Sequence, residues 1–227
     1  MKTIVIVGGS KGIGSAIVKN LIDTHNIINL SRTEPELKHP HLVHHTCNII
    51  EDDLPDIDFA DALVYCPGSI NLKPFSRLSL TDFKSDFEIN VLGAVKAIQK
   101  YLPLLKIGND SAILLFSTVA AKLGMPYHAS VATVKSGIEG LVKSLGAELA
   151  PTVRINAIAP TVTDTGLASK LLRNEKMIES ISERHPLKKL LVPSEVAEMA
   201  AFLLSNKAAS MSGQIFEMDC GIVSFKT

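Results

Sequence analysis

The stretch VGGSKGIG, residues 7–14, follows the β-branched apolar run TIVIV at 3–7 and opens a segment with helical spacing at 12–24. A strand, a glycine-rich turn and a helix form the local order that a dinucleotide site requires. Glycines let the backbone approach a pyrophosphate, and the helix N-terminus offers free N–H groups and a positive dipole end. Glycines also mark ordinary tight turns, so other parts of the chain are needed to decide whether this turn binds a dinucleotide. The residues expected to contact a cofactor here are Gly8, Ser10, Lys11, Gly12, Ile13 and Gly14.

Outward from this turn, apolar runs alternate with helical patterns. The longest helical patterns cover 81–105 and 129–149, and Pro151 ends the second. This alternation predicts an α/β fold of Rossmann type, a doubly wound parallel sheet of about seven strands with helices on both faces. Without repeats or linkers, residues 1–227 are expected to form one domain, with a helical substrate flap around 163–193. The further strands are expected at 27–30, 42–46, 62–65, 112–116, 153–159 and 214–218.

Composition narrows the choice of partner. Of 227 residues, 46% are hydrophobic, and the 23 Lys and Arg balance the 23 Asp and Glu. A net charge of zero argues against nucleic acid or an anionic membrane and favours a small molecule. Cys47, Cys66 and Cys220 have no metal-binding spacing, which predicts reduced thiols and a cytoplasmic location. The apolar run at the N-terminus stops at Gly8, so neither a signal peptide nor a membrane span is expected there.

The histidine cluster His39, His41, His44 and His45 suggests a metal site at first sight. His44 and His45 would point to opposite faces of a strand, and the cluster has no carboxylate or thiolate partner at helical spacing. We therefore expect a solvated turn and no metal.

The end of the second predicted strand indicates which dinucleotide fits. An Asp or Glu there would accept hydrogen bonds from the ribose of NAD, whereas a 2'-phosphate needs cations. The strand ends in Ser31 and Arg32, a hydroxyl and a guanidinium, and Lys11 adds a second cation from the glycine turn. Single basic residues are usually only solvated, but two at these places favour NADP(H).

Four more segments carry a family resemblance: NVLG at 90–93, KSGIEGL at 135–141, NAIAPTVTDT at 156–165 and SGQ at 212–214. Together with the glycine turn they resemble the short-chain dehydrogenase/reductase family over essentially the whole chain. The resemblance implies that Asn90 supports a proton relay and that Lys135 binds the nicotinamide ribose. It places Gly68, within YCPG at 65–68, and Asn48 near the cofactor, each in a segment that departs from the family pattern. The residues expected to receive the nicotinamide end are Pro160, Val162 and Thr165.

The chain departs from the family at its proton donor. Family members use a Ser, a Tyr and a Lys, with the Tyr one helical turn before the Lys. Counting back from Lys135 gives Val131 at the Tyr position and Thr118, with Ser117 beside it, at the Ser position. Val131 has no proton to donate.

A second register exists, because YHASV at 127–131 resembles YxASK and would restore the Tyr but lose the Lys. Pro126, Thr118 and the run after Lys135 favour the first register. Tyr127 and, with less support, His128 are then the candidates for a substitute acid. If Pro126 is the first helical residue, Tyr127 lies one turn before Val131 and its side chain can bend toward that position. The simpler alternative is that Tyr127 packs under the adjacent loop.

Two functions follow from these residues. The first is an NADP(H)-dependent oxidoreductase acting on a carbonyl or alcohol, slowed by the loss of the Tyr or served by an atypical proton donor. The second is a non-catalytic NADP(H)-binding sensor or scaffold. The family resemblance also implies a homodimer or homotetramer, built by pairing the two long helices.

Overall fold

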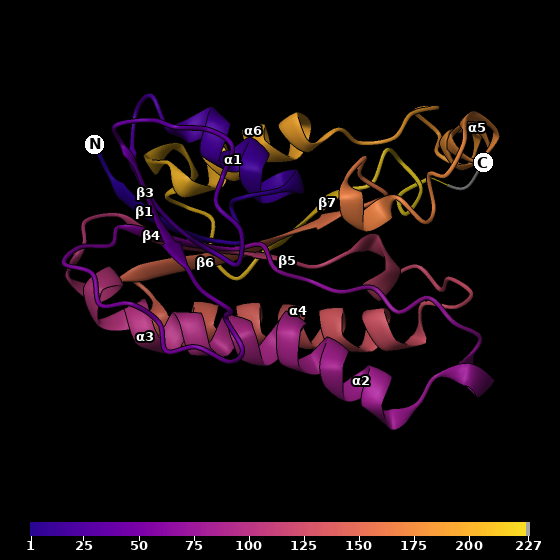
Figure 1. Cartoon of the computed structure of the whole chain (residues 1–227), viewed down its shortest axis with the longest axis horizontal. Coiled ribbons are helices and arrows are strands. Elements are labelled where there is room, and N and C mark those ends of the chain that lie inside the picture. The colour runs from indigo at the N-terminus through magenta and orange to yellow at the C-terminus, as the bar shows by residue number, and fades with distance from the viewer. Residues whose placement is uncertain (226–227) are drawn as a thin grey trace.

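Seven parallel strands form one sheet in the computed structural model, which describes residues 1–225 (Figure 1). The strand order is β3-β2-β1-β4-β5-β6-β7. The chain runs outward from β1 to β3 and then returns to add β4 on the other side of β1. This doubly wound order confirms the predicted fold class, and ligands of such sheets bind at the carboxyl ends near this reversal. The strands are β1 (Thr3–Val7), β2 (Asn26–Ser31), β3 (Leu42–Thr46), β4 (Ala62–Tyr65), β5 (Ser111–Phe116), β6 (Val153–Pro160) and β7 (Ile215–Met218).

Helices cover both faces of the sheet. On one face lie α1 (Gly12–Leu21) and α6 (Pro193–Leu204), which pack on each other, and on the opposite face lie α3 (Gly93–Ile107) and α4 (Ala129–Leu149) (Figure 1). Every residue of β4 and β5 is buried, because a central parallel strand has helices on both sides. Two hydrophobic clusters result, one on each face of the same sheet.

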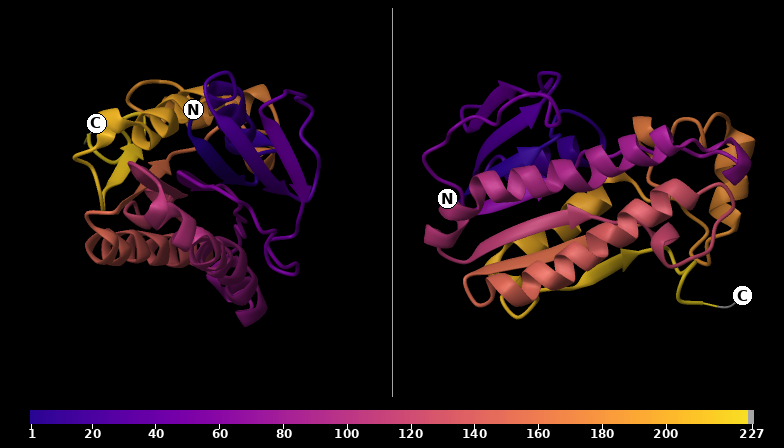
Figure 2. Two further views of the ribbon diagram at one scale, coloured as in Figure 1. Left: turned by 90° about the vertical axis from the view of Figure 1, so that its left-hand side faces the viewer. Right: turned by 90° about the horizontal axis from the view of Figure 1, so that it is seen from below.

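The predicted helix 81–105 consists of three consecutive parts. They are α2 (Leu80–Phe87), a π-helical turn η2 (Glu88–Leu92) and α3 (Gly93–Ile107). Ser79 and Asp82 form a capping box that begins α2. Single π-helical turns inside helices occur often at functional sites, and this one contains Asn90. Together, α2, η2 and α3 form a long rod that runs beside α4 on the same face of the sheet (Figure 2).

The segment predicted as a flap, 163–193, leaves the sheet after β6. Its two ends meet in a β-bridge between Thr163 and Leu191, and it contains the short helices η4 (Gly166–Ala168) and α5 (Glu175–Glu183). No residue of α5 is buried, and the helix lies at one end of the molecule, apart from the helical layers (Figure 1). Within residues 1–225, no helix combines the length and apolar character needed to cross a membrane.

Candidate functional site

A cavity of about 170 Å³ opens where the chain leaves the carboxyl ends of β4, β5 and β6. The flap closes one side of it through Leu167, Ala168 and Leu171. This position agrees with the expectation that a doubly wound sheet binds ligands at its carboxyl edge. The predicted site residues that line the cavity are Ile13, Gly68, Asn90, Thr118, Lys135, Pro160, Val162 and Thr165.

Lys135 reaches the cavity from α4. Its Nζ is buried and donates a 2.8 Å hydrogen bond to the carbonyl oxygen of Phe116, at the end of β5. Burial, which disfavours the charged ammonium, lowers the pKa of Lys135 to about 8, although Cys66 and Asp86 partly oppose this shift. Lys135 is therefore a hydrogen-bond donor of near-neutral pKa, fixed against the sheet.

Asn90 lies beside Lys135, in the π-helical turn. Its Nδ2 donates to the carbonyl oxygen of Asp86 at 2.8 Å and to Ser69 Oγ at 3.1 Å. Its buried Oδ1 has no partner among the residues that the structure describes. Gly68 borders both groups, because a Cβ at that position would lie 3.1 Å from Asn90 Oδ1 and 3.7 Å from Lys135 Nζ. A bound hydroxyl or water between Asn90 and Lys135 would donate the hydrogen bond that this buried acceptor lacks.

Val131 lies one helical turn before Lys135 and forms part of the cavity wall. The residue is 4% exposed. No proton donor occupies this position. Thr118 also lines the cavity. Its Oγ1 caps the short helix η3 (Val119–Ala121) by accepting from the Ala120 N–H, and it donates to the Pro160 carbonyl oxygen at 3.5 Å. Ser117 also lines the cavity, but its hydroxyl donates to Glu139 Oε1 at 2.7 Å. Of the two neighbouring hydroxyls, Thr118 is the more available to a ligand, because its 3.5 Å hydrogen bond to Pro160 is much longer than the 2.7 Å bond from Ser117 to Glu139.

The structure corrects the expected position of Tyr127. Helix α4 begins at Ala129 and not at Pro126, so Tyr127 is not one helical turn before Val131. Tyr127 has a positive φ of 69°, is 59% exposed and is not among the residues lining the cavity. A left-handed backbone at this residue turns the chain into the helix and directs the phenol outward.

His128, the N-cap residue of α4, lines the cavity instead. Its Nδ1 lies 2.7 Å from the carbonyl oxygen of Pro126. A carbonyl oxygen can only accept, so in the neutral ring the proton sits on Nδ1. Nε2 is then the nitrogen with a free lone pair.

Sequence reasoning missed Asp86, a fully buried carboxylate on α2. Its Oδ1 accepts from Ser69 Oγ at 2.5 Å and Asn71 Nδ2 at 2.9 Å, and its Oδ2 accepts from Ser130 Oγ at 2.6 Å. Three donors compensate the cost of burying the charge. The available signal was its spacing, one helical turn before Asn90, which places a carboxylate on the same inward face.

The glycine turn fits a dinucleotide phosphate. Gly8 and Gly12 have φ values of 81° and 54°, which residues with side chains rarely adopt. A Cβ at Gly14 would lie only 2.2 Å from the Gly8 carbonyl oxygen, so helix and turn pack at a distance that only glycine allows. The side chain of Lys11, the N-cap of α1, makes no capping hydrogen bond within the described part of the chain. The first N–H groups of α1 thus form a cradle suited to an anion.

The residues predicted for the adenosine end divide into two groups. Arg32 and Lys11 are exposed, as a phosphate-binding role requires. Ser31 is buried and its hydroxyl is occupied, because it donates to the Thr33 carbonyl oxygen at 2.9 Å. Ser10 Oγ instead lies 3.0 Å from Thr33 Oγ1, a residue that the sequence reasoning did not single out. Asn48 is likewise engaged in its own turn, donating to Glu51 at 2.7 Å.

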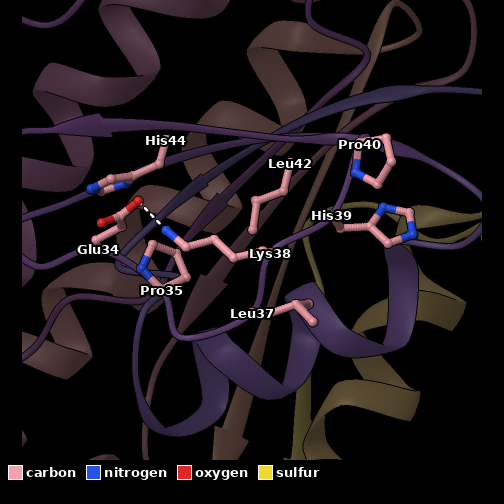
Figure 3. Close-up of a pocket in the computed structure, with 8 residues that line it drawn as sticks. All are labelled: Glu34, Pro35, Leu37, Lys38, His39, Pro40, Leu42 and His44. Atoms are coloured by element: carbon pink, nitrogen blue, oxygen red, sulfur yellow. Dashed lines mark hydrogen bonds and ion pairs between the residues drawn. The ribbon is translucent and has the colours of Figure 1, made fainter.

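A larger surface hollow of about 510 Å³ lies under the loop between β2 and β3 (Figure 3). Glu34 and Lys38 form an ion pair at this hollow, and His39 and His44 also line it. It contains none of the predicted cofactor or catalytic residues. Within residues 1–225, no cluster of three or more His, Cys, Asp or Glu side chains could hold a metal.

Comparison with known proteins gives consistent matches. Residues 36–223 match the family model described as enoyl-(acyl carrier protein) reductase. The chain is 28% identical to an uncharacterized oxidoreductase of Bacillus subtilis, covering 97% of this chain and 98% of the relative. It is 30% identical to a 3-oxoacyl-(acyl-carrier-protein) reductase of Rickettsia typhi, over 98% and 97% of the two chains.

Solved structures agree in fold along the whole length. The ligand-free aldohexose dehydrogenase of Thermoplasma acidophilum superposes with a TM-score of 0.90 at 25% identity, covering 100% of this chain and 96% of that one. A structure of the protein ElxO with NADP bound has a TM-score of 0.87 at 23% identity, over 99% and 100% of the two chains. The fold of this chain therefore occurs in solved structures, one of which is named a dehydrogenase.

Proposed function

Because the chain belongs to the short-chain dehydrogenase/reductase family, an oxidoreductase family whose members bind NAD(P)(H), we propose that it is an NADP(H)-dependent reductase of a carbonyl compound, or the reverse dehydrogenase. One observation carries the proposal: Lys135 Nζ and the unpartnered Asn90 Oδ1 border Gly68 in a cavity that Thr118 also lines. Lys135 would serve cofactor binding as well, whereas Thr118 and the open acceptor of Asn90 favour a catalytic role over cofactor binding alone.

Bound NADP(H) supplies or accepts the hydride. The glycine turn and the N-terminus of α1 hold the pyrophosphate, while Lys11 and Arg32 bind the 2'-phosphate with Ser10 and Thr33 beside them. Ser31 contributes indirectly, because its buried hydroxyl holds the Thr33 backbone. Lys135 donates to the nicotinamide ribose. Gly68 lets the cofactor approach, Asn48 shapes the turn after β3, and the nicotinamide end is received by Pro160, Val162 and Thr165.

Two parts of the chain assist the reaction at the substrate oxygen: the Thr118 hydroxyl, and Asn90 together with Lys135. The Thr118 hydroxyl donates a hydrogen bond to the carbonyl oxygen, which stabilises the negative charge that develops there during reduction. Asn90 Oδ1 accepts from a water that hydrogen-bonds Lys135 and supplies protons to the site. Neither group replaces a phenol at position 131, so the proton transfer step is expected to limit the rate.

The substrate class follows from the remaining walls. Apart from the groups already named, the cavity is mostly apolar, which favours an aliphatic or aromatic carbonyl compound over a sugar. The flap contributes part of this surface, so it selects the substrate and excludes water. The apolar residues concerned are Ile70, Val119, Met125, Val131, Leu167 and Leu171.

Non-catalytic NADP(H) binding is the second candidate, and Val131 is the observation that favours it. Two measurements on the same protein distinguish the candidates: NADPH affinity by fluorescence titration, and NADPH oxidation with a panel of aliphatic and aromatic aldehydes and ketones. The oxidoreductase function predicts saturable, carbonyl-dependent oxidation together with binding. Tight binding without oxidation in the presence of any compound identifies a sensor.

A further inference from the structure

The cavity lacks a proton donor at Val131, although reduction of a carbonyl requires one. We propose that His128 moves this proton, through its Nε2, an assignment that rests on the proposed reductase function. In the reduction, the carbonyl carbon receives the hydride and the carbonyl oxygen takes the proton from Nε2 of the imidazolium. The ring is left neutral and regains its proton from water, so one carbonyl, one NADPH and one proton give one alcohol and one NADP⁺.

The groups that share the cavity leave few alternatives. Among the described residues, the titratable side chains lining it are Cys66, His128 and Lys135. Burial raises the pKa of Cys66 to about 12, which makes the thiol a poor donor near neutrality. Lys135 donates to the Phe116 carbonyl and, in the proposed function, to the ribose. An imidazole, which titrates near neutrality, is the side chain best suited to transfer a proton at physiological pH.

The hydrogen bond to Pro126 orients His128 for this role. The 2.7 Å contact between Nδ1 and the Pro126 carbonyl oxygen fixes both the ring and its tautomer. Histidines that act as acid or base catalysts use this arrangement: an acceptor holds one ring nitrogen, and the other nitrogen is free to exchange a proton. The backbone is fixed as well, because the His128 carbonyl accepts from the Ala132 N–H at 2.8 Å in the first turn of α4.

Few titratable groups share the cavity with His128. The loop after β4 contributes Cys66 and α4 contributes Lys135, while the loop after β6 and the flap present only hydroxyl and apolar side chains to the cavity in the described part of the chain. Burial lowers the pKa of Lys135 to about 8 in the same cavity, so the part of the pH dependence that belongs to His128 is the part that is lost in His128→Asn. The kcat for reduction falls with rising pH as the imidazolium loses its proton, and the kcat for alcohol oxidation rises over the same range.

The test variant is His128→Asn, whose amide can still donate to the Pro126 carbonyl but has no group in place of Nε2. We expect kcat for NADPH-dependent reduction to fall by about 10²- to 10⁴-fold, with the NADPH dissociation constant unchanged and the descending limb of the pH profile lost. Tyr127→Phe is the matched control, and its kcat should equal that of the wild type. In His128→Asn/Val131→Tyr, the new phenol should restore part of the lost rate.

The protonation of the two His128 ring nitrogens can be measured independently of activity. Nitrogen-15 spectra of the cofactor-free protein, with the signal assigned by its loss in His128→Asn, should show a neutral ring protonated on Nδ1. A ring protonated on Nε2, or wild-type kcat in His128→Asn, overturns the assignment while leaving the reductase function standing. A wild-type protein that binds NADPH but reduces no carbonyl overturns both.

Discussion

Ser130 Oγ donates a 2.6 Å hydrogen bond to Asp86 Oδ2, and this contact joins α4 to α2 inside the protein. It matters for the site because α4 carries Val131 and Lys135, while the rod that begins with α2 carries Asn90. The same carboxylate also holds the loop after β4 through Ser69 and Asn71. Asp86 thus fixes the relative positions of three segments that line or support the cavity.

Removing this carboxylate should destabilise the fold. In Asp86→Ala, three donors lose their partner, one of which, Ser130, is fully buried, and we expect the free energy of unfolding to fall by about 3 kcal/mol. Ser130→Ala, which removes one of the three hydrogen bonds, should cost about 1 kcal/mol. Urea denaturation of the two variants checks the order. Equal, small losses in both would show that Asp86 does not organise this region.

Cofactor choice should depend on charge at the end of β2. Arg32→Asp replaces a phosphate-binding fork with a carboxylate that repels the 2'-phosphate and can accept from a ribose hydroxyl. We expect NADPH affinity to fall at least tenfold, while NADH affinity is kept or improved. Fluorescence titration with both cofactors measures this, and Arg32→Gln separates loss of the cation from added repulsion. Unchanged NADPH affinity in Arg32→Asp would contradict the assignment.

The buried lysine should make stability depend on pH in a defined window. Burial lowers the pKa of Lys135 from 10.5 to about 8, so between these values the unfolded chain binds more protons than the folded one. The free energy of unfolding contributed by this group therefore rises with pH from about 8 to 10.5. Urea denaturation of wild type and Lys135→Met isolates the effect, because the other titrating groups cancel. A free energy of unfolding of the wild type that stays constant or falls relative to that of Lys135→Met as the pH rises would contradict the burial of the amine.

Assembly is a further prediction. The family resemblance pairs the two long helices between subunits, and Phe87 and Leu92 are partly exposed on the rod formed by α2, η2 and α3. We expect a homodimer or homotetramer by light scattering at micromolar concentration. Phe87→Glu/Leu92→Glu should shift the mass toward the monomer without changing the far-UV circular dichroism. A wild-type monomer would rule out this mode of assembly.

The sequence was informative where local pattern and chemistry coincide. The glycine turn and the seven strands follow from spacing, because the strands of a parallel sheet are buried apolar runs and its ligand-binding turns follow their carboxyl ends. Lys135 was singled out by the family resemblance. Tyr127 could not be placed in this way, because its position depends on a left-handed backbone angle and on a helix that begins two residues after it.

Other features depended on contacts between distant segments. The π-helical turn at Asn90 does not interrupt the apolar spacing, so the pattern 81–105 predicts one regular helix. Ser31 and Asn48 have the expected chemistry, but their side chains are held by neighbours two or three residues away. Asp86 draws its partners from residues 69, 71 and 130, a combination that only the folded chain brings together.

The measurement that tests the central claim most directly is carbonyl-dependent NADPH oxidation by the wild type and by Val131→Tyr, with NADPH affinity measured for both. A phenol at position 131 lies one helical turn from Lys135, whose cationic form lowers its pKa and eases proton transfer. The oxidoreductase account predicts that both proteins bind NADPH and reduce an apolar carbonyl to its alcohol, with the variant at least as fast as the wild type. NADPH binding by both proteins, with no carbonyl-dependent oxidation by either, would contradict it.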